Sequence, residues 1–247
     1  MENQKFSSWH GSNESDLLWI TAKAGCGKTT LAAHISQNIT INQSSHPQGP
    51  EINKIKPVVL FFFFHKSNQE AEGTATAALR TITSQLVRQV PHVLSIVLQR
   101  YDFLSARGAF EWSWENLLGI FSEMLEHLTL ESRVYIILDA VDECEGDSRQ
   151  TILDWIQGLV DGSKFSPPSK TSRPILKLVI TSRPDEIVFD RLSRFQTLEM
   201  TNLDTANDMR TLIHNWMDDF ATSTLKSPRV SPAFSKTTLM ECFSGLS

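Results

Sequence analysis

The sequence has no hydrophobic run long enough to span a bilayer and no apolar segment at its amino terminus. Its longest uninterrupted apolar run covers residues 57–64, whereas a membrane-spanning helix needs about 20 such residues. The opening residues, MENQK, lack the apolar stretch of a secretory signal. We therefore expect no membrane association and a cytoplasmic location.

The sequence also has few cysteines and no excess of basic over acidic residues. The three cysteines, Cys26, Cys144 and Cys242, lie far apart and form neither a disulfide framework nor a CxxC zinc pattern. Free thiols of this kind persist in the cytosol. The formal net charge is −5, and broad nucleic-acid binding needs a basic face. We therefore expect no nucleic-acid partner.

Buried-strand and amphipathic-helix patterns alternate along the chain, which predicts an α/β fold with a mostly parallel sheet and helices on both faces. Strands are predicted at residues 17–21, 58–64, 134–138, 176–180 and 196–200. Helices are predicted at residues 28–38, 73–90, 114–128 (with Ser113 as its cap) and 209–220. Loops are predicted at residues 42–56 and 162–174. The phenylalanine-rich strand 58–64 has no alternation, so we expect it to be buried on both faces.

A glycine-rich segment directly follows the first predicted strand. Its glycines allow backbone N–H groups to approach phosphate oxygens, and the following helix directs its positive end toward them. Lys28 adds a positive charge for the β- and γ-phosphates, and the Thr29 hydroxyl is suited to ligate magnesium. Ala22 replaces the first glycine of the GxxxxGK[ST] pattern, from which we expect a modest distortion. The predicted nucleotide-binding residues are Ala22, Gly25, Cys26, Gly27, Lys28, Thr29 and Thr30. The predicted ligand is ATP or GTP with Mg²⁺.

The predicted strand 134–138 ends in Asp139. If this strand lies parallel beside the predicted strand 17–21, which leads into the glycine-rich loop, Asp139 would reach the magnesium, usually through a water. Glu143 is suited to orient or deprotonate a water that attacks the γ-phosphate, and Asp142 could share that task. The alternative interpretation is an acidic loop on the surface.

Arg183 follows the predicted strand 176–180 in the sequence TSRP. An arginine at the carboxyl end of such a strand can reach a γ-phosphate. The same four letters occur at residues 171–174 inside a predicted loop. Arg183 is favoured as the phosphate-contacting arginine only because it follows a predicted strand. No NKxD segment is present, which disfavours a Ras-type GTPase and leaves the base open.

Residues 18–20, the loop 22–29, LDAVDEC at 138–144 and TSRP at 181–184 together resemble a NACHT domain. Such domains are signal-transducing P-loop NTPases of the STAND class. The sequences of these motifs most resemble those of the fungal NOD-like receptor type with a nephrocystin-like N-terminal NTPase. The resemblance implies a nucleotide-gated switch, self-association through the NTPase domain, and roles such as innate immunity or heterokaryon incompatibility. It also implies a diphosphate-sensing histidine in a winged helix, a role that neither His34 nor His214 inherits.

We expect an N-terminal extension over residues 1–16, the NACHT P-loop NTPase domain over 17–202, and a truncated helical subdomain over 203–247. The leading hypothesis is a nucleoside triphosphate-binding switch with slow Mg²⁺-dependent hydrolysis. A non-hydrolysing nucleotide-binding scaffold remnant is the alternative. A P-loop small-molecule kinase is a third option, disfavoured because no arginine-rich lid segment is evident.

Overall fold

The computed structural model describes residues 4–41, 57–66, 73–106, 108, 111–129, 132–162 and 173–201. The chain divides into two compact units, Met1–Met200 and Thr201–Ser247, and every element described below belongs to the first. The predicted loop 42–56, residues 163–172 of the next predicted loop, the predicted helix 209–220 and the expected subdomain 203–247 lie outside the described residues.

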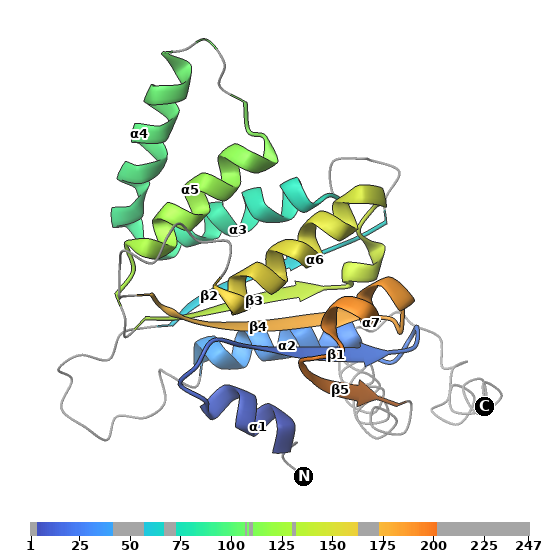
Figure 1. The fold of residues 1–247 in the computed structure, drawn as a ribbon. Helices are drawn as coiled ribbons and strands as arrows, with labels where there is room; N and C mark the ends of the chain where they lie inside the picture. The colour runs from blue at the N-terminus through green and yellow to red at the C-terminus, as the bar shows by residue number, and fades with distance from the viewer. Residues whose placement is uncertain are drawn as a thin grey trace, which may run out of the picture. The chain divides into compact units, whose positions relative to one another are not determined.

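A five-stranded sheet forms the centre of the first unit (Figure 1). Its strands are β1 (Asp16–Ala22), β2 (Val58–Phe63), β3 (Arg133–Asp139), β4 (Ile175–Ser182) and β5 (Gln196–Met200). Their order is β2-β3-β4-β1-β5, and each pairing is parallel. The predicted α/β class and parallel sheet are therefore confirmed, and the carboxyl ends of all five strands lie at one edge.

Two expectations about strand placement were wrong. Strand β3 does not lie beside the P-loop strand β1, because β4 pairs with both of them. Strand β2 is an edge strand, so its carboxyl half is only partly covered and the Phe61 side chain is 40% exposed. Both errors have the same cause: an apolar run indicates a strand but does not encode which strands become its neighbours.

Helices cover both faces of the sheet (Figure 1). Helices α1 (Gln4–Gly11) and α2 (Lys28–Ile41) pack on one face, where Leu18 and Ile20 of β1 are buried. The other face carries α3 (Ala75–Gln89), α5 (Trp114–Glu126), α6 (Gly146–Asp161) and α7 (Glu186–Leu192), over Leu17 and Trp19. Helix α4 (Leu94–Ser105) packs against α5. No helix in these described ranges combines the length and apolar character that crossing a bilayer requires.

The helices predicted at 28–38, 73–90 and 114–128 are present as α2, α3 and α5. The Ser113 hydroxyl accepts a hydrogen bond from Asn116 N–H at the start of α5. Helices α1, α4, α6 and α7 were not predicted. Residues 4–11, within the expected extension over 1–16, form α1, whose Trp9 side chain is fully buried. This helix therefore contributes to the core beneath the sheet.

Two glutamine side chains of α3 cover the open edge of β2. The Gln85 carboxamide accepts from Phe61 N–H at 2.8 Å and donates to Phe61 C=O at 2.9 Å. Gln89 makes the same pair of hydrogen bonds with Val59, at 3.0 and 2.7 Å. Backbone groups that a further strand would use are thus satisfied by side chains of the same chain.

Lys177 is a buried cation on the face of the sheet covered by α1. Its side chain is 0% exposed, its Nζ lies 5.9 Å from the centroid of the Trp9 ring, and that nitrogen has no hydrogen-bond partner. Burial is the main cause that lowers the Lys177 pKa; Arg133 lowers it further, and Asp16 opposes the shift. In the pH range between the lowered pKa and the ordinary value of 10.5, the unfolded chain therefore binds more protons than the folded chain, and stability rises with pH there.

We predict that Lys177→Met raises the free energy of unfolding at neutral pH by about 1–2 kcal/mol, because an unpaired buried ammonium is replaced by an apolar side chain of similar length. The gain should shrink as the pH approaches the ordinary lysine pKa, where the unfolded wild-type chain also loses its proton. Urea unfolding at pH 7 and near pH 10 measures both effects. A destabilised variant, or a gain that is the same at both pH values, would contradict this account.

Candidate functional site

The candidate site lies at the carboxyl edge of the sheet, where β1 and β4 are neighbours. The connection after β1 leads to α2 on one face, and the connection after β4 leads to α7 on the other. Neighbouring strands whose connections leave on opposite faces open a crevice, which is where ligands bind in open parallel sheets. The loops after β1, β3 and β4 all meet at this edge.

The loop between β1 and α2 is shaped by two glycines. Gly25 has a φ of 79° and Gly27 a φ of 75°, both in the left-handed region that side chains disfavour. Ala22, which replaces the first glycine of the motif, is not among the described residues with positive φ. Alanine is therefore accommodated there without the strain of a left-handed backbone. Helix α2 begins directly at Lys28.

The Lys28 side chain folds back over the loop that precedes it. Its Nζ donates to the Ala22 carbonyl at 2.8 Å and to the Lys23 carbonyl at 3.0 Å. These contacts hold the ammonium group against the backbone at the start of the loop that precedes α2. Positive charge, loop amides and the helix end are thus concentrated in one place.

Asp139, at the end of β3, connects the loops after three strands. Its side chain is buried at 2% exposure. The Thr29 hydroxyl donates to Asp139 Oδ2 at 2.6 Å, and the Thr181 hydroxyl at the end of β4 donates to Oδ1. Thr181 Oγ1 also accepts from Ala140 N–H at 2.9 Å, and the Ala140 backbone is left-handed with a φ of 55°. Thr29 and Asp139 therefore meet as expected, although β4 lies between their strands.

The acidic loop after β3 is joined to the loop after β4 by Arg183. Arg183 N–H donates to Asp142 Oδ1 at 2.9 Å, its Nε lies 3.5 Å from Asp142 Oδ2, and its Nη2 lies 3.3 Å from Glu143 Oε1. The Asp142 side chain is 9% exposed, against 26% for Glu143. Glu143 Oε2 also accepts from Lys66 N–H at 3.2 Å. The three residues expected to be catalytic are thus together, and they contact one another.

The remaining predicted residues of the loop differ in exposure. Cys26 is buried at 2% and belongs to the core beneath the loop, whereas the Thr30 side chain is exposed on the first turn of α2. Burial raises the pKa of Cys144, in the acidic loop, to about 11. The Cys144 thiol is therefore protonated at neutral pH and is not a nucleophile.

A hydroxyl and a carboxylate that suit a magnesium ion lie in direct contact at this site. Thr29 and Asp139 supply hard oxygen ligands in direct contact, and Mg²⁺ takes one or two such protein ligands while phosphates and waters complete its octahedron. The described residues contain no cluster of three or more histidine, cysteine or acidic side chains that could hold a metal. The donor set therefore fits magnesium held jointly with phosphates.

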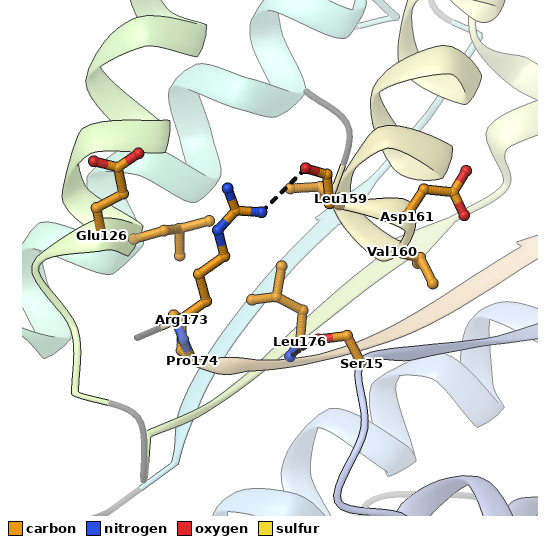
Figure 2. A pocket seen from close by; sticks show the side chains of 10 residues that line it. Ser15, Glu126, Leu159, Val160, Asp161, Arg173, Pro174 and Leu176 are labelled. Carbon is orange, nitrogen blue, oxygen red and sulfur yellow. Dashed lines mark hydrogen bonds between the residues drawn. The ribbon is translucent and has the colours of Figure 1, made fainter. Parts of the chain in front are cut away.

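A cavity of about 220 Å³ lies at the opposite edge of the sheet, between the start of β4 and the carboxyl ends of α5 and α6. Arg173 reaches across it and donates to the Gly162 carbonyl at 3.1 Å (Figure 2). This cavity is far along the strands from the glycine loop, so it is not part of the candidate site.

A glycine loop between β1 and α2, with Lys28 at its end and Asp139 across from Thr29, defines a P-loop NTPase-like domain. Residues 1–183 match the model of the family described as Nephrocystin 3, N-terminal. The chain belongs to this family, which confirms the resemblance indicated by its motifs.

The chain is related to the vegetative incompatibility protein HET-E-1 of Podospora anserina, with 30% identity over 231 residues. The alignment covers 91% of this chain and 15% of that protein. Among solved structures, Drosophila ORC bound to DNA has a TM-score of 0.42 and 13% identity, covering 78% of this chain and 39% of that one. The Aeropyrum pernix ORC2 protein in ADPNP–ADP complexes has a TM-score of 0.39 and 17% identity, with coverages of 79% and 44%. Similarities this low carry no argument about this chain.

The hydrogen bonds of Thr181, a member of the TSRP segment for which the sequence predicted no role, lead to a prediction. Thr181→Val should lower the free energy of unfolding by about 1–3 kcal/mol, because Asp139 loses a buried donor and Ala140 N–H loses its acceptor. Thr181→Ser keeps the hydroxyl and should recover most of that loss. Chemical denaturation of the two variants makes the comparison, and equal stability of Val and Ser would contradict it.

Proposed function

We propose that this domain binds a nucleoside triphosphate, ATP or GTP, together with Mg²⁺, and hydrolyses it slowly as part of a signalling switch. The observation that carries the proposal is the 2.6 Å contact between the Thr29 hydroxyl and Asp139, directly beside the glycine loop and Lys28. A hydroxyl at the start of α2 and a buried carboxylate across from it are the ligands expected for a phosphate-bound magnesium.

Binding would divide among three kinds of group. The amides of residues 25–29 and the amino terminus of α2 would hold phosphate oxygens, and Lys28 would exchange its two loop carbonyls for the β- and γ-phosphates. Thr29 and Asp139 would hold the magnesium, which neutralises developing charge on the phosphates. Ala22, Cys26 and Thr30 would shape the loop and the first turn.

For hydrolysis, Glu143 is the better candidate for the base. Both carboxylate oxygens of Asp142 face Arg183, and its side chain is almost fully covered, whereas Glu143 is more exposed. In this proposal Glu143 orients and deprotonates the attacking water, and Asp142 anchors Arg183. A γ-phosphate would compete with Glu143 for the Arg183 guanidinium, which would release the carboxylate for its task.

The switching role rests on family membership and on the geometry of Arg183. Contacts that form with a triphosphate but not with a diphosphate shift the population between two arrangements of the loops. We further propose that the domain works in the cytosol and self-associates through this unit. The alternative, a nucleotide-binding module without turnover, is favoured by one observation, the pairing of Arg183 with both acids.

Lys28→Ala should weaken triphosphate binding by roughly ten- to a hundredfold, because one charge-assisted contact contributes about 1.5–3 kcal/mol. Isothermal titration with a slowly hydrolysed triphosphate and Mg²⁺ measures the change. Lys23→Ala, which removes an exposed lysine at a variable position of the same loop, is the matched control. Unchanged affinity in the Lys28 variant would remove the phosphate-loop assignment.

Glu143→Gln should retain triphosphate binding while phosphate release falls by roughly 10²–10⁴-fold, since the amide cannot accept the proton of water. Asp142→Asn should have the smaller effect on turnover. Phosphate release under single-turnover conditions separates these variants. Wild-type turnover in Glu143→Gln would assign the role elsewhere, and an inert wild-type protein that still binds nucleotide would favour the module without turnover.

A further inference from the structure

Arg149 lies between the acidic loop after β3 and the loop that carries Arg183. It belongs neither to the segment LDAVDEC at 138–144 nor to the segment TSRP at 181–184. It is in the first turn of α6 (Gly146–Asp161), where a cation interacts unfavourably with the positive end of the helix. Its side chain is 23% exposed. A partly buried arginine at this end of a helix does not stabilise the helix itself, so its contacts with other elements must account for its position.

Those contacts bracket Glu143. Arg149 Nε donates to the Cys144 carbonyl at 3.1 Å, and Nη2 donates to the Asp142 carbonyl. These are the backbone carbonyls on either side of Glu143, at the end of the short 3₁₀ turn Val141–Glu143. Carbonyls at the end of such a turn have no partner within it, and the planar guanidinium satisfies both at once.

The third nitrogen of the same guanidinium reaches the other loop. Arg149 Nη1 lies 3.4 Å from Asp185 Oδ2. The other oxygen of Asp185 caps α7, accepting from Ile187 N–H at 3.0 Å and Val188 N–H at 3.3 Å. Asp185 is two residues after Arg183, so its position helps to fix where the Arg183 backbone leaves β4.

We infer that Arg149 is a positioning residue that sets the placement of Glu143 relative to Arg183, and through them the alignment of the attacking water with the γ-phosphate. The inference deepens the proposed function and rests on it for the catalytic consequence. A rigid fork that holds two carbonyls and a capping carboxylate fixes two loops with one side chain. Lysine, a single point charge, cannot make all three contacts.

The test uses Arg149→Gln, Arg149→Lys and a matched control. Arg191 of α7 pairs with Asp154 of α6 at 2.7 Å, so Arg191→Gln breaks an ion pair between the same two helices without touching the acidic loop. Arg149→Gln should lower kcat by about tenfold to a hundredfold while the Kd for a slowly hydrolysed triphosphate stays within about threefold of wild type. Arg149→Lys should recover part of the loss, and Arg191→Gln should match wild type in both measurements.

A second measurement does not depend on turnover. Amide hydrogen exchange in peptides covering residues 141–146 and 183–188 should accelerate in both segments of Arg149→Gln and in neither segment of Arg191→Gln. An inert wild-type protein would defeat the proposed hydrolysis, and exchange would still decide the role of Arg149. Unchanged exchange, unchanged turnover in an active enzyme, or an equal loss of affinity and turnover would each overturn the inference.

Discussion

One buried carboxylate organises the functional edge of this domain. Asp139 accepts hydrogen bonds from Thr29 at the start of α2 and from Thr181 at the end of β4, and it terminates β3 itself. A carboxylate that is nearly inaccessible to water requires such donors, because an unpaired buried charge is strongly destabilising. The loops after three strands are therefore fixed relative to one another by the same group that supplies the candidate magnesium ligand. Stability of the edge and competence of the site depend on one set of contacts.

The two cations at this edge, Lys28 and Arg183, have different kinds of partner. Lys28 is satisfied by carbonyls of its own loop, whereas Arg183 is satisfied by Asp142 and Glu143 across the crevice. Both cations thus have oxygen partners that a polyanionic ligand could replace. Arg149 holds the backbone carbonyls of the acidic loop. An exchange of partners by Arg183 would therefore free Glu143 Oε1 without releasing the loop that carries it.

Much of the fold could be predicted from the sequence because burial leaves a local pattern. Apolar runs located strands β1 to β4, and the spacing of Leu79, Ile82 and Leu86 located α3. Strand β5, with the sequence QTLEM, was predicted without such a run. Helix α6 was not predicted, although Ile152, Ile156 and Leu159 carry the same kind of spacing and could have located it. Strand order could not be predicted, since every buried strand has a similar composition. The same limit applies to the roles of Thr181 and Arg149, because their contacts join loops from distant parts of the chain. Thr181 belongs to the TSRP segment, but that segment does not encode its contact with Asp139, and Arg149 lies in none of the motifs.

The glutamine pairs on β2 have a consequence for assembly. An exposed edge of a parallel sheet ordinarily offers a ladder of amide and carbonyl groups to any extended peptide. Here Gln85 and Gln89 occupy that ladder at Phe61 and Val59. Two copies of this domain cannot merge their sheets through β2 unless these carboxamides first withdraw. A contact between subunits along β2 would therefore form between side chains and not through a shared sheet. Such a contact could break without disrupting the strand pairing of either subunit.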